Sequence, residues 1–367
     1  MNLHNQGAPM RTKTSCSFFA TGKDFCAFSS ERRHPVHHED TKTRRIAKDF
    51  FASSCLRGEI FLVATPVSFY SKESCMRTLK TLLDGLSFPE GPRWRDGRLL
   101  FSDMHRQRVI AVDPAGRSET VLELNSSCPS GLGWLPDGRL LVVSMEDRRL
   151  LRADPEGPVV VADCTPFAGF HCNDMVVDAE GRAYIGNFGF DLHGGGTPCP
   201  ANLVLVRPAE DACVAASDLW FPNGAVITSD GKTLVVAETF AARLTAFDIL
   251  PDGSLSHRRV WASLGKADNP LGETPQPPVP DGIALDAEGG IWVASPTTRE
   301  VLRVLEGGAI TERIPVSTSA FACMLGGADG RTLFVCTSLH SHPVHCRETR
   351  TGRIEYCEVD VPHAGLP

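Results

Sequence analysis

Short apolar runs bounded by turn-forming residues recur along the chain from residue 76 onward. Pairs of these runs flank an acidic residue followed by Gly, in the segments RDGR at Arg95, PDGR at Pro136, AEGR at Ala179, SDGK at Ser229, AEGG at Ala287 and ADGR at Ala328. An acidic residue and Gly between two apolar runs is typical of a β-hairpin. A third and often a fourth run follows each hairpin, so the pattern predicts six units of three to four strands.

No helical periodicity of comparable strength accompanies these runs, and the intervals between them are too short for helices of a parallel α/β fold. Repeated antiparallel units that cannot bury both faces alone predict an all-β fold, the six-bladed β-propeller. The run LKTLLDGLS at 78–86 has no partner before the first unit, and we expect it to supply the outer strand of the sixth blade. Closing the ring in this way also protects two sheet edges.

Residues 1–75 contain no hairpin of this kind and none of the five Trp. We therefore interpret them as an N-terminal extension, either disordered or a misassigned start. The propeller domain is predicted to occupy residues 76–367.

One polar position recurs at a fixed distance before each hairpin turn. Counting back seven residues from the acidic turn residue gives Ser130, Asn173, Asn223, Asp281 and Ala322, and the shorter first loop gives Glu90. This position opens the innermost strand of each blade, so its members should form a ring at one mouth of the central channel. Asp, Asn and Ser before Gly are also ordinary turn formers. Two carboxylates and two amides at one register nevertheless favour a site for a hard divalent cation, and the lack of His and Cys disfavours structural zinc.

These residues occur within FPEGPRW, HCNDMVVDAEG, FPNGAVITSDGKTLVVAET, PDGIALDAEGGIWVA and ACMLGGADGRTLFV. In their order on six units they resemble the senescence marker/gluconolactonase/luciferin-regenerating-enzyme-like (regucalcin-like) family, over about Leu82 to Pro362. The resemblance implies one catalytic divalent metal held by Glu90, Asn173, Asn223 and Asp281. It implies hydrolysis of a lactone, most often a sugar lactone such as gluconolactone, with Ca²⁺ as the first expectation and Mg²⁺, Mn²⁺ or Zn²⁺ as alternatives. Sugar lactonases of the family often carry Arg where this chain has His171, which puts aldonolactone specificity in doubt.

The residues suit this chemistry. A bound cation would polarise the lactone carbonyl and lower the pKa of water, and Asp281 is our candidate for the carboxylate that accepts the water proton. Blade topology places Asp103, Glu146, Asn187 and Glu238 near the same mouth. We expect His171 and Asn187 to contact substrate. The insertions 190–202 and 266–280 lie on this face as lids or as plain surface loops.

Composition limits the partners. The chain has a formal net charge of −7, which disfavours nucleic acid and anionic membranes. Its 13 Cys form no CxxC pair, which favours reduced thiols in a cytoplasmic protein. The segment HSHPVHC at 340–346 reads as a loop without regular ligand spacing, so a second metal site is not expected there.

Two other functions remain open. A propeller that binds Ca²⁺ without turnover would carry the same ring residues. A related propeller esterase, like strictosidine synthase or paraoxonase, would need a catalytic Glu or a His pair at the mouth, and only His171 is found there.

Overall fold

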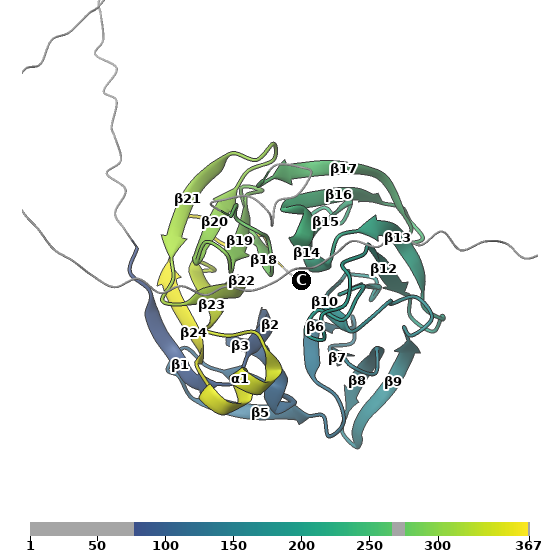
Figure 1. Ribbon diagram of the computed structural model, residues 1–367, viewed down its shortest axis with the longest axis horizontal. Coiled ribbons are helices and arrows are strands. Elements are labelled where there is room, and N and C mark those ends of the chain that lie inside the picture. The colour runs from purple at the N-terminus through teal and green to yellow at the C-terminus, as the bar shows by residue number, and fades with distance from the viewer. Residues whose placement is uncertain (1–76, 266–275, 366–367) are drawn as a thin grey trace, which may run out of the picture. The chain divides into compact units, whose positions relative to one another are not determined.

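The computed structural model describes residues 77–265 and 276–365, which belong to a compact unit within Ser71–Pro367. The predicted extension 1–75 and residues 266–275 of the second insertion lie outside the described residues. Within the described part, six four-stranded antiparallel sheets surround a common axis (Figure 1). The predicted all-β, six-bladed propeller is confirmed.

The strands of blades 1 to 5 follow one another outward from the axis in sequence order, and blade 6 ends with the first strand of the described chain. Blade 1 comprises β2 (Pro89–Arg95), β3 (Arg98–Asp103), β4 (Arg108–Val112) and β5 (Ser118–Glu123). Blade 2 comprises β6 (Pro129–Trp134), β7 (Leu140–Ser144), β8 (Arg149–Asp154) and β9 (Gly157–Asp163). Blade 3 comprises β10 (Cys172–Val177), β11 (Ala183–Asn187), β12 (Ala201–Val206) and β13 (Cys213–Leu219).

Blades 4 to 6 repeat the arrangement. Blade 4 comprises β14 (Pro222–Ile227), β15 (Thr233–Glu238), β16 (Arg243–Ile249) and β17 (Leu255–Ser263). Blade 5 comprises β18 (Ile283–Leu285), β19 (Ile291–Ser295), β20 (Glu300–Val304) and β21 (Ile310–Pro315). Blade 6 comprises β22 (Ser319–Gly326), β23 (Thr332–Ser338), β24 (Gly352–Glu358) and β1 (Lys80–Leu86). The described helices are η1 (Met104–Arg106), η2 (Thr239–Ala241) and α1 (Pro343–Thr349), and none is long and apolar enough to cross a bilayer.

Blade 6 closes the ring with strands from both ends of the described chain. Strand β1 pairs antiparallel with β24, with Lys80 opposite Tyr356 and Leu83 opposite Ile354. Figure 1 shows the two side by side, one purple-blue and the other yellow. The predicted closure by residues 78–86 is confirmed.

The recurring acidic–Gly pairs form the turns between the first and second strands of the blades. The Gly of each pair has a positive φ, between 71° and 89°. Such a left-handed backbone is readily adopted only by Gly. This conformational demand explains why the same pair returns in every unit.

Glycines also let the inner strands approach the axis. A Cβ on Gly131 would lie 2.4 Å from the backbone N of Met175, and one on Gly282 would lie 2.5 Å from the Cβ of Ala322. The Gly282 amide donates to the Phe321 carbonyl at 2.8 Å, joining two blades. In blades 1, 2, 4 and 5 the residue after the ring position is Gly, because neighbouring backbones touch there.

The apolar faces of adjacent blades pack against each other. One core cluster joins blades 1, 5 and 6 around Phe101 and Trp292, and another joins blades 3 and 4 around Tyr184. These three side chains are fully buried. The stability of the ring thus depends on contacts between blades as well as on the sheets.

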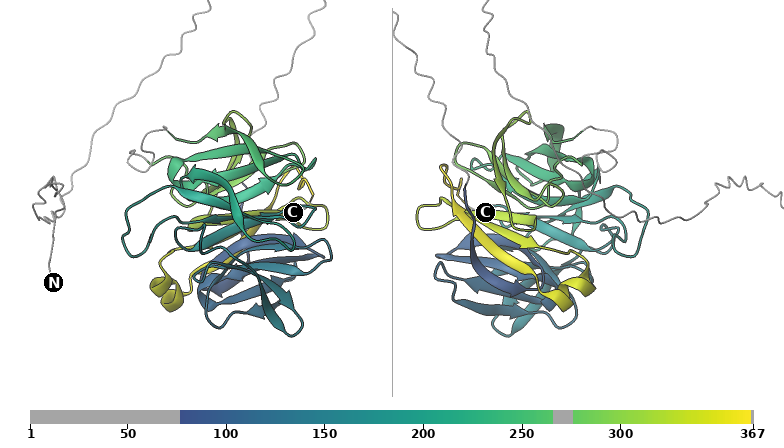
Figure 2. Two further views of the ribbon diagram at one scale, coloured as in Figure 1. Left: turned by 90° about the vertical axis from the view of Figure 1, so that its right-hand side faces the viewer. Right: turned by 60° about the vertical axis from the view of Figure 1, so that its left-hand side comes forward.

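The segment HSHPVHC differs from the prediction of a loop, because it enters helix α1. Pro343 occupies the first turn, where its missing N–H is no loss, and the His342 Nδ1 accepts from the Val344 amide at 3.3 Å. Figure 2 shows α1 projecting from one face of the propeller. The described residues hold no group of three or more His, Cys, Asp or Glu that could bind a metal, this cluster included.

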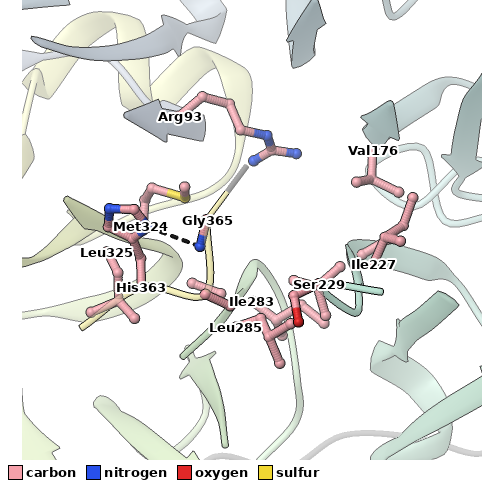
Figure 3. A pocket seen from close by; sticks show the side chains of 14 residues that line it. Arg93, Val176, Ile227, Ser229, Ile283, Leu285, Met324, Leu325, His363 and Gly365 are labelled. Carbon is pink, nitrogen blue, oxygen red and sulfur yellow. Dashed lines mark hydrogen bonds between the residues drawn. The ribbon is translucent and has the colours of Figure 1, made fainter. Parts of the chain in front are cut away.

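The opposite end of the axis is covered by the segment 362–365. The Ala287 amide donates to Pro362 O at 2.8 Å and the Ala364 amide donates to Leu285 O at 3.1 Å. Figure 3 shows the small hollow at this end, with Arg93 and Met324 on one side and Ile227 and Ser229 on the other.

Candidate functional site

A cavity of about 490 Å³ opens on the face that carries α1, η1 and η2. All four predicted ring residues line it, namely Glu90, Asn173, Asn223 and Asp281. Each is at most 8% exposed. Because they open the inner strands of blades 1, 3, 4 and 5, we call them the floor of the cavity.

Hydrogen bonds fix the amides of the floor in a chain. The Ser130 hydroxyl donates to Asn173 Oδ1 at 3.2 Å, and Asn173 Nδ2 donates to Asn223 Oδ1 at 2.8 Å. Asn223 Nδ2 then donates to the Thr239 hydroxyl at 3.2 Å, which donates to the Pro280 carbonyl at 2.8 Å. Each amide oxygen accepts one hydrogen bond and keeps a second lone pair.

The two floor carboxylates lack a cationic partner. Burial raises the pKa of Glu90 well above its usual value, and the nearby charges of Asp281 and Asp174 raise it further. Burial likewise raises the pKa of Asp281, to about 8, against the opposing effect of its contact with Asn223. Among the described residues neither carboxylate forms an ion pair. When two carboxylates lie close together away from water, protonation of at least one of them is favoured unless a cation binds between them.

Beneath the floor, a buried ion pair occupies the channel. The guanidinium of Arg93 lies 3.2 Å from Asp174 Oδ1, and both side chains are buried. Asp174 stands at the register where blades 1, 2, 4 and 5 have Gly, and its carboxylate forms the pair with Arg93. Arg93 also lines the hollow at the far end of the axis. The Arg93–Asp174 pair therefore lies between the floor of the cavity and this hollow.

The structure places His171 in the cavity wall, with its ring stacked on Phe170 at a centroid distance of 4.0 Å. Burial lowers the pKa of His171, which favours the neutral imidazole. Glu146 also lines the cavity, as do Asp191, Leu192 and His193 from the first insertion. Residues 191–193 of the first insertion therefore border the cavity, on the face where the sequence placed this insertion.

Asn187, Asp103 and Glu238 do not line the cavity, and all three are fully buried. Asn187 donates to Asn202 O at 2.6 Å and accepts from the Gly189 amide. Asp103 accepts from the amides of Ser87 and Phe88. Glu238 accepts from the Trp220 amide at 2.9 Å and pairs with Arg243. These side chains satisfy buried backbone N–H groups behind the wall and thereby help to hold the backbone around the cavity.

Most wall residues were not identified from the sequence, although they follow the same register. One tier lies two residues before the floor position and consists of Phe88, Cys128, His171, Phe221 and Val279. A second tier directly follows the second strand of each blade and consists of Met104, Met145, Phe188, Thr239, Pro296 and Leu339. Counting from the hairpin turns would have found the first tier and, at eight residues after the acidic turn residue, Met104, Met145, Phe188 and Pro296 of the second.

The floor residues fit a divalent cation by their chemistry. Two carboxylates and two amide oxygens form a hard oxygen donor set of the kind that Ca²⁺, Mg²⁺ and Mn²⁺ prefer. A divalent cation would also relieve the repulsion between Glu90 and Asp281, which the charge of Arg93 offsets only in part.

The fold and site define a class: a six-bladed propeller with an oxygen-donor floor in a cavity at one end of its axis. Residues 88–339 match the family model described as the SMP-30/Gluconolactonase/LRE-like region. The chain belongs to this family.

Curated relatives and solved structures agree with this assignment. Regucalcin of Xenopus laevis is 25% identical over 260 residues, which cover 68% of this chain and 82% of regucalcin. L-arabinolactonase of Azospirillum brasilense is 27% identical over 165 residues, covering 45% of this chain and 46% of the relative, less than half its length. The crystal structure of a calcium-binding protein, regucalcin, from Agrobacterium tumefaciens superposes with a TM-score of 0.64 at 19% identity, covering 79% of this chain and 97% of the other. Lactonase-type activity is thus supported at the level of the family.

Proposed function

We propose that the protein is a divalent-metal-dependent lactonase whose reaction takes place on the cavity floor. The observation that carries the proposal is the convergence of Glu90, Asn173, Asn223 and Asp281 at the bottom of a cavity large enough for a small molecule. All four are buried, and among the described residues none of them forms an ion pair. The lactonase and calcium-binding relatives support the same assignment.

Glu90, Asn173, Asn223 and Asp281 would hold the cation, which would supply Lewis-acid polarisation of the lactone carbonyl. Glu90 is tied in place by the Gly91 amide, which donates to Oε2 at 3.1 Å. The amides are oriented by Ser130 and Thr239. The floor is therefore rigid before substrate arrives, as electrostatic catalysis requires.

Asp281 accepts a proton from water as the water oxygen bonds to the lactone carbonyl carbon. The ring C–O bond then breaks, and its oxygen takes up a proton to become the hydroxyl of a hydroxy acid. One water is consumed and no oxidant or further reactant is needed. The apolar wall keeps other water away from the reacting carbonyl.

A lactone panel assayed by pH-stat on chelator-treated protein, with single metals restored, tests this function. We expect loss of activity on treatment and recovery with Ca²⁺ first, or with Mg²⁺, Mn²⁺ or Zn²⁺. Calorimetry should give one metal site per chain. Full activity in the metal-free protein would refute the metal dependence.

The second candidate is a non-catalytic Ca²⁺-binding propeller, which the calcium-binding relative favours. Tight Ca²⁺ binding with no turnover of any lactone would establish it. Because the floor residues are shared, the lactone assay separates the two candidates.

A further inference from the structure

Outside the floor, apolar side chains predominate in the wall of the cavity: 14 of the 23 described residues that line it are apolar, and the polar ones include His105, Glu146 and His193. In the two wall tiers, all members except His171 and Thr239 are apolar. Further apolar side chains are added by Phe170, Phe240, Phe321 and Leu192. A polyhydroxylated ligand would need hydrogen-bond partners at these positions, because an unpaired hydroxyl buried against hydrocarbon is unfavourable.

Five phenylalanines around the cavity contact one another in two groups. Phe88 meets Phe321 edge-on at 4.7 Å between ring centroids, on the side of blades 1 and 6. On the side of blades 3 and 4, Phe188 meets Phe221 at 4.6 Å and Phe221 meets Phe240 at 5.1 Å. With Phe170 and the methionines they form one apolar cluster, separate from the cores between the blades. Its faces toward the cavity offer aromatic surface on two opposite sides.

Phe221 adopts a backbone conformation that a bulky residue rarely accepts, with φ at 56°. Such a conformation costs on the order of 1–3 kcal/mol and persists at sites where the surroundings require it. Here it precedes the floor residue Asn223 and orients an aromatic ring that borders the cavity. This strain is a second sign that the apolar wall is built for a ligand.

The charge of the residues that line the cavity also limits which substrates can bind. Of the described residues that line it, none is Lys or Arg, whereas Glu90, Glu146, Asp191 and Asp281 are acidic. An anionic substrate would meet repulsion there, with or without one divalent cation on the floor. The same repulsion would expel the carboxylate that hydrolysis produces.

We propose that the substrate is a neutral lactone bearing a hydrocarbon substituent, alkyl or aryl, rather than a polyhydroxylated or phosphorylated sugar lactone. This proposal rests on the lactonase function proposed above and names its substrate class. The lactone carbonyl would face the floor, and the hydrocarbon substituent would lie between the two phenylalanine groups.

Steady-state kinetics of metal-loaded protein on δ-valerolactone, δ-decalactone and D-glucono-1,5-lactone test the proposal. Each methylene buried by the wall should raise kcat/KM by up to about fourfold, so the pentyl group of δ-decalactone should raise it at least about tenfold over δ-valerolactone. Gluconolactone should be the poorest of the three. A higher kcat/KM for gluconolactone than for δ-decalactone would overturn the substrate class and leave the lactonase function standing.

Binding of lactams, which resist hydrolysis, separates recognition from catalysis. By calorimetry, 6-pentyl-2-piperidinone should bind at least about tenfold more tightly than 2-piperidinone. Equal affinity would overturn the proposal. If the pentyl lactam binds tightly but no lactone is turned over with any metal, the apolar recognition stands and the lactonase function fails.

Variants locate the effect. Phe240→Ala and Phe321→Ala, on opposite walls and only partly buried, should each weaken binding of the pentyl lactam about tenfold or more. Val260→Ala is the matched control, because Val260 is 58% exposed on the outer strand β17. It should change neither binding nor melting temperature. Unchanged pentyl-lactam affinity in both Phe variants would place the ligand outside this wall.

Discussion

At the scale of single residues, Asp281 and Asn223 share the floor but are given different tasks. Both offer an oxygen to a cation, whereas only the carboxylate of Asp281 can accept a proton. Substitutions that keep the oxygen therefore separate the two roles.

Asp281→Asn should lower turnover by roughly 10²–10⁴-fold, the usual effect of losing an acid–base group, while metal affinity weakens modestly. Asn223→Ala should mainly lose metal affinity, and excess metal should partly restore its rate. Metal titrations with kcat measured at saturation check both. If Asp281→Asn keeps near wild-type turnover at saturating metal, Asp281 is a metal ligand only and does not accept the proton.

His105 carries a pH dependence of stability. Burial lowers its pKa to about 4, and the charges of Arg347 and His193 add to this, against the Ser341 carbonyl and Asp103. Folding therefore favours the neutral imidazole. The contribution of His105 to the free energy of unfolding is fully present above pH 6.5 and is lost as the pH falls toward 4. The loss amounts to up to about 3 kcal/mol.

In His105→Phe, urea unfolding between pH 7 and pH 4.5 should lose less stability than in the wild type, because Phe keeps the stacking on Phe88 but has no proton to bind. Parallel pH profiles of the two proteins would show that other groups govern acid unfolding.

At the scale of elements, the inner strands depend on glycines that allow backbones to touch. Gly282→Ala would place a methyl group 2.5 Å from the Cβ and 2.7 Å from the Cα of Ala322. Since neither atom can move freely, we expect a destabilisation of about 3 kcal/mol, the upper end for an overpacked site. Metal affinity should also fall, because the strand carries Asp281.

Gly97→Ala is the control for this change. Its Cβ would meet nothing within 4 Å, so it should cost only about 1–2 kcal/mol for its left-handed backbone. Chemical denaturation and metal calorimetry measure both quantities. If the two variants bind metal equally well, the close approach at Gly282 does not hold the floor in place.

The blades and the floor were predictable because both follow one register that is visible in the hairpin turns. Two features escaped that reasoning. Asp103 and Glu238 were placed at the mouth by their strand positions, but their carboxylates turn toward buried amides that require acceptors. Helix α1 escaped because its seven residues are too few to show a helical periodicity in the sequence. The substrate roles of His171 and Asn187 stay predictions.

At the scale of the whole molecule, stability depends on the closing strand. A chain that begins at Ser87 lacks β1 and exposes the edge of β24, together with the surface that buries Leu86. Loss of Leu86 and of the partly buried Leu82 and Leu83 should cost about 4–6 kcal/mol. At roughly 2–4 °C per kcal/mol, the melting temperature should fall by about 10 °C or more.

A chain that begins at Met76 keeps β1 and is the control. It should melt cooperatively and keep its metal affinity, since all strands of the six described blades lie at Lys80 or later. Equal melting temperatures for the two chains would show that β1 contributes little, and failure of the longer one to fold would refute the predicted boundary near residue 76.

The two wall tiers stand at registers separate from the floor, and buried side chains such as Asp103 and Glu238 hold the backbone from behind. Exchanging wall residues therefore alters which molecules enter, while the groups that act on them keep their geometry. In a lineage of such proteins, the accepted substrate can diverge through a few exchanges at these registers while the reaction is inherited unchanged. The repeat places the residues that contact the substrate and the residues that carry the reaction at different registers. The apolar wall of this chain is one result of that separation.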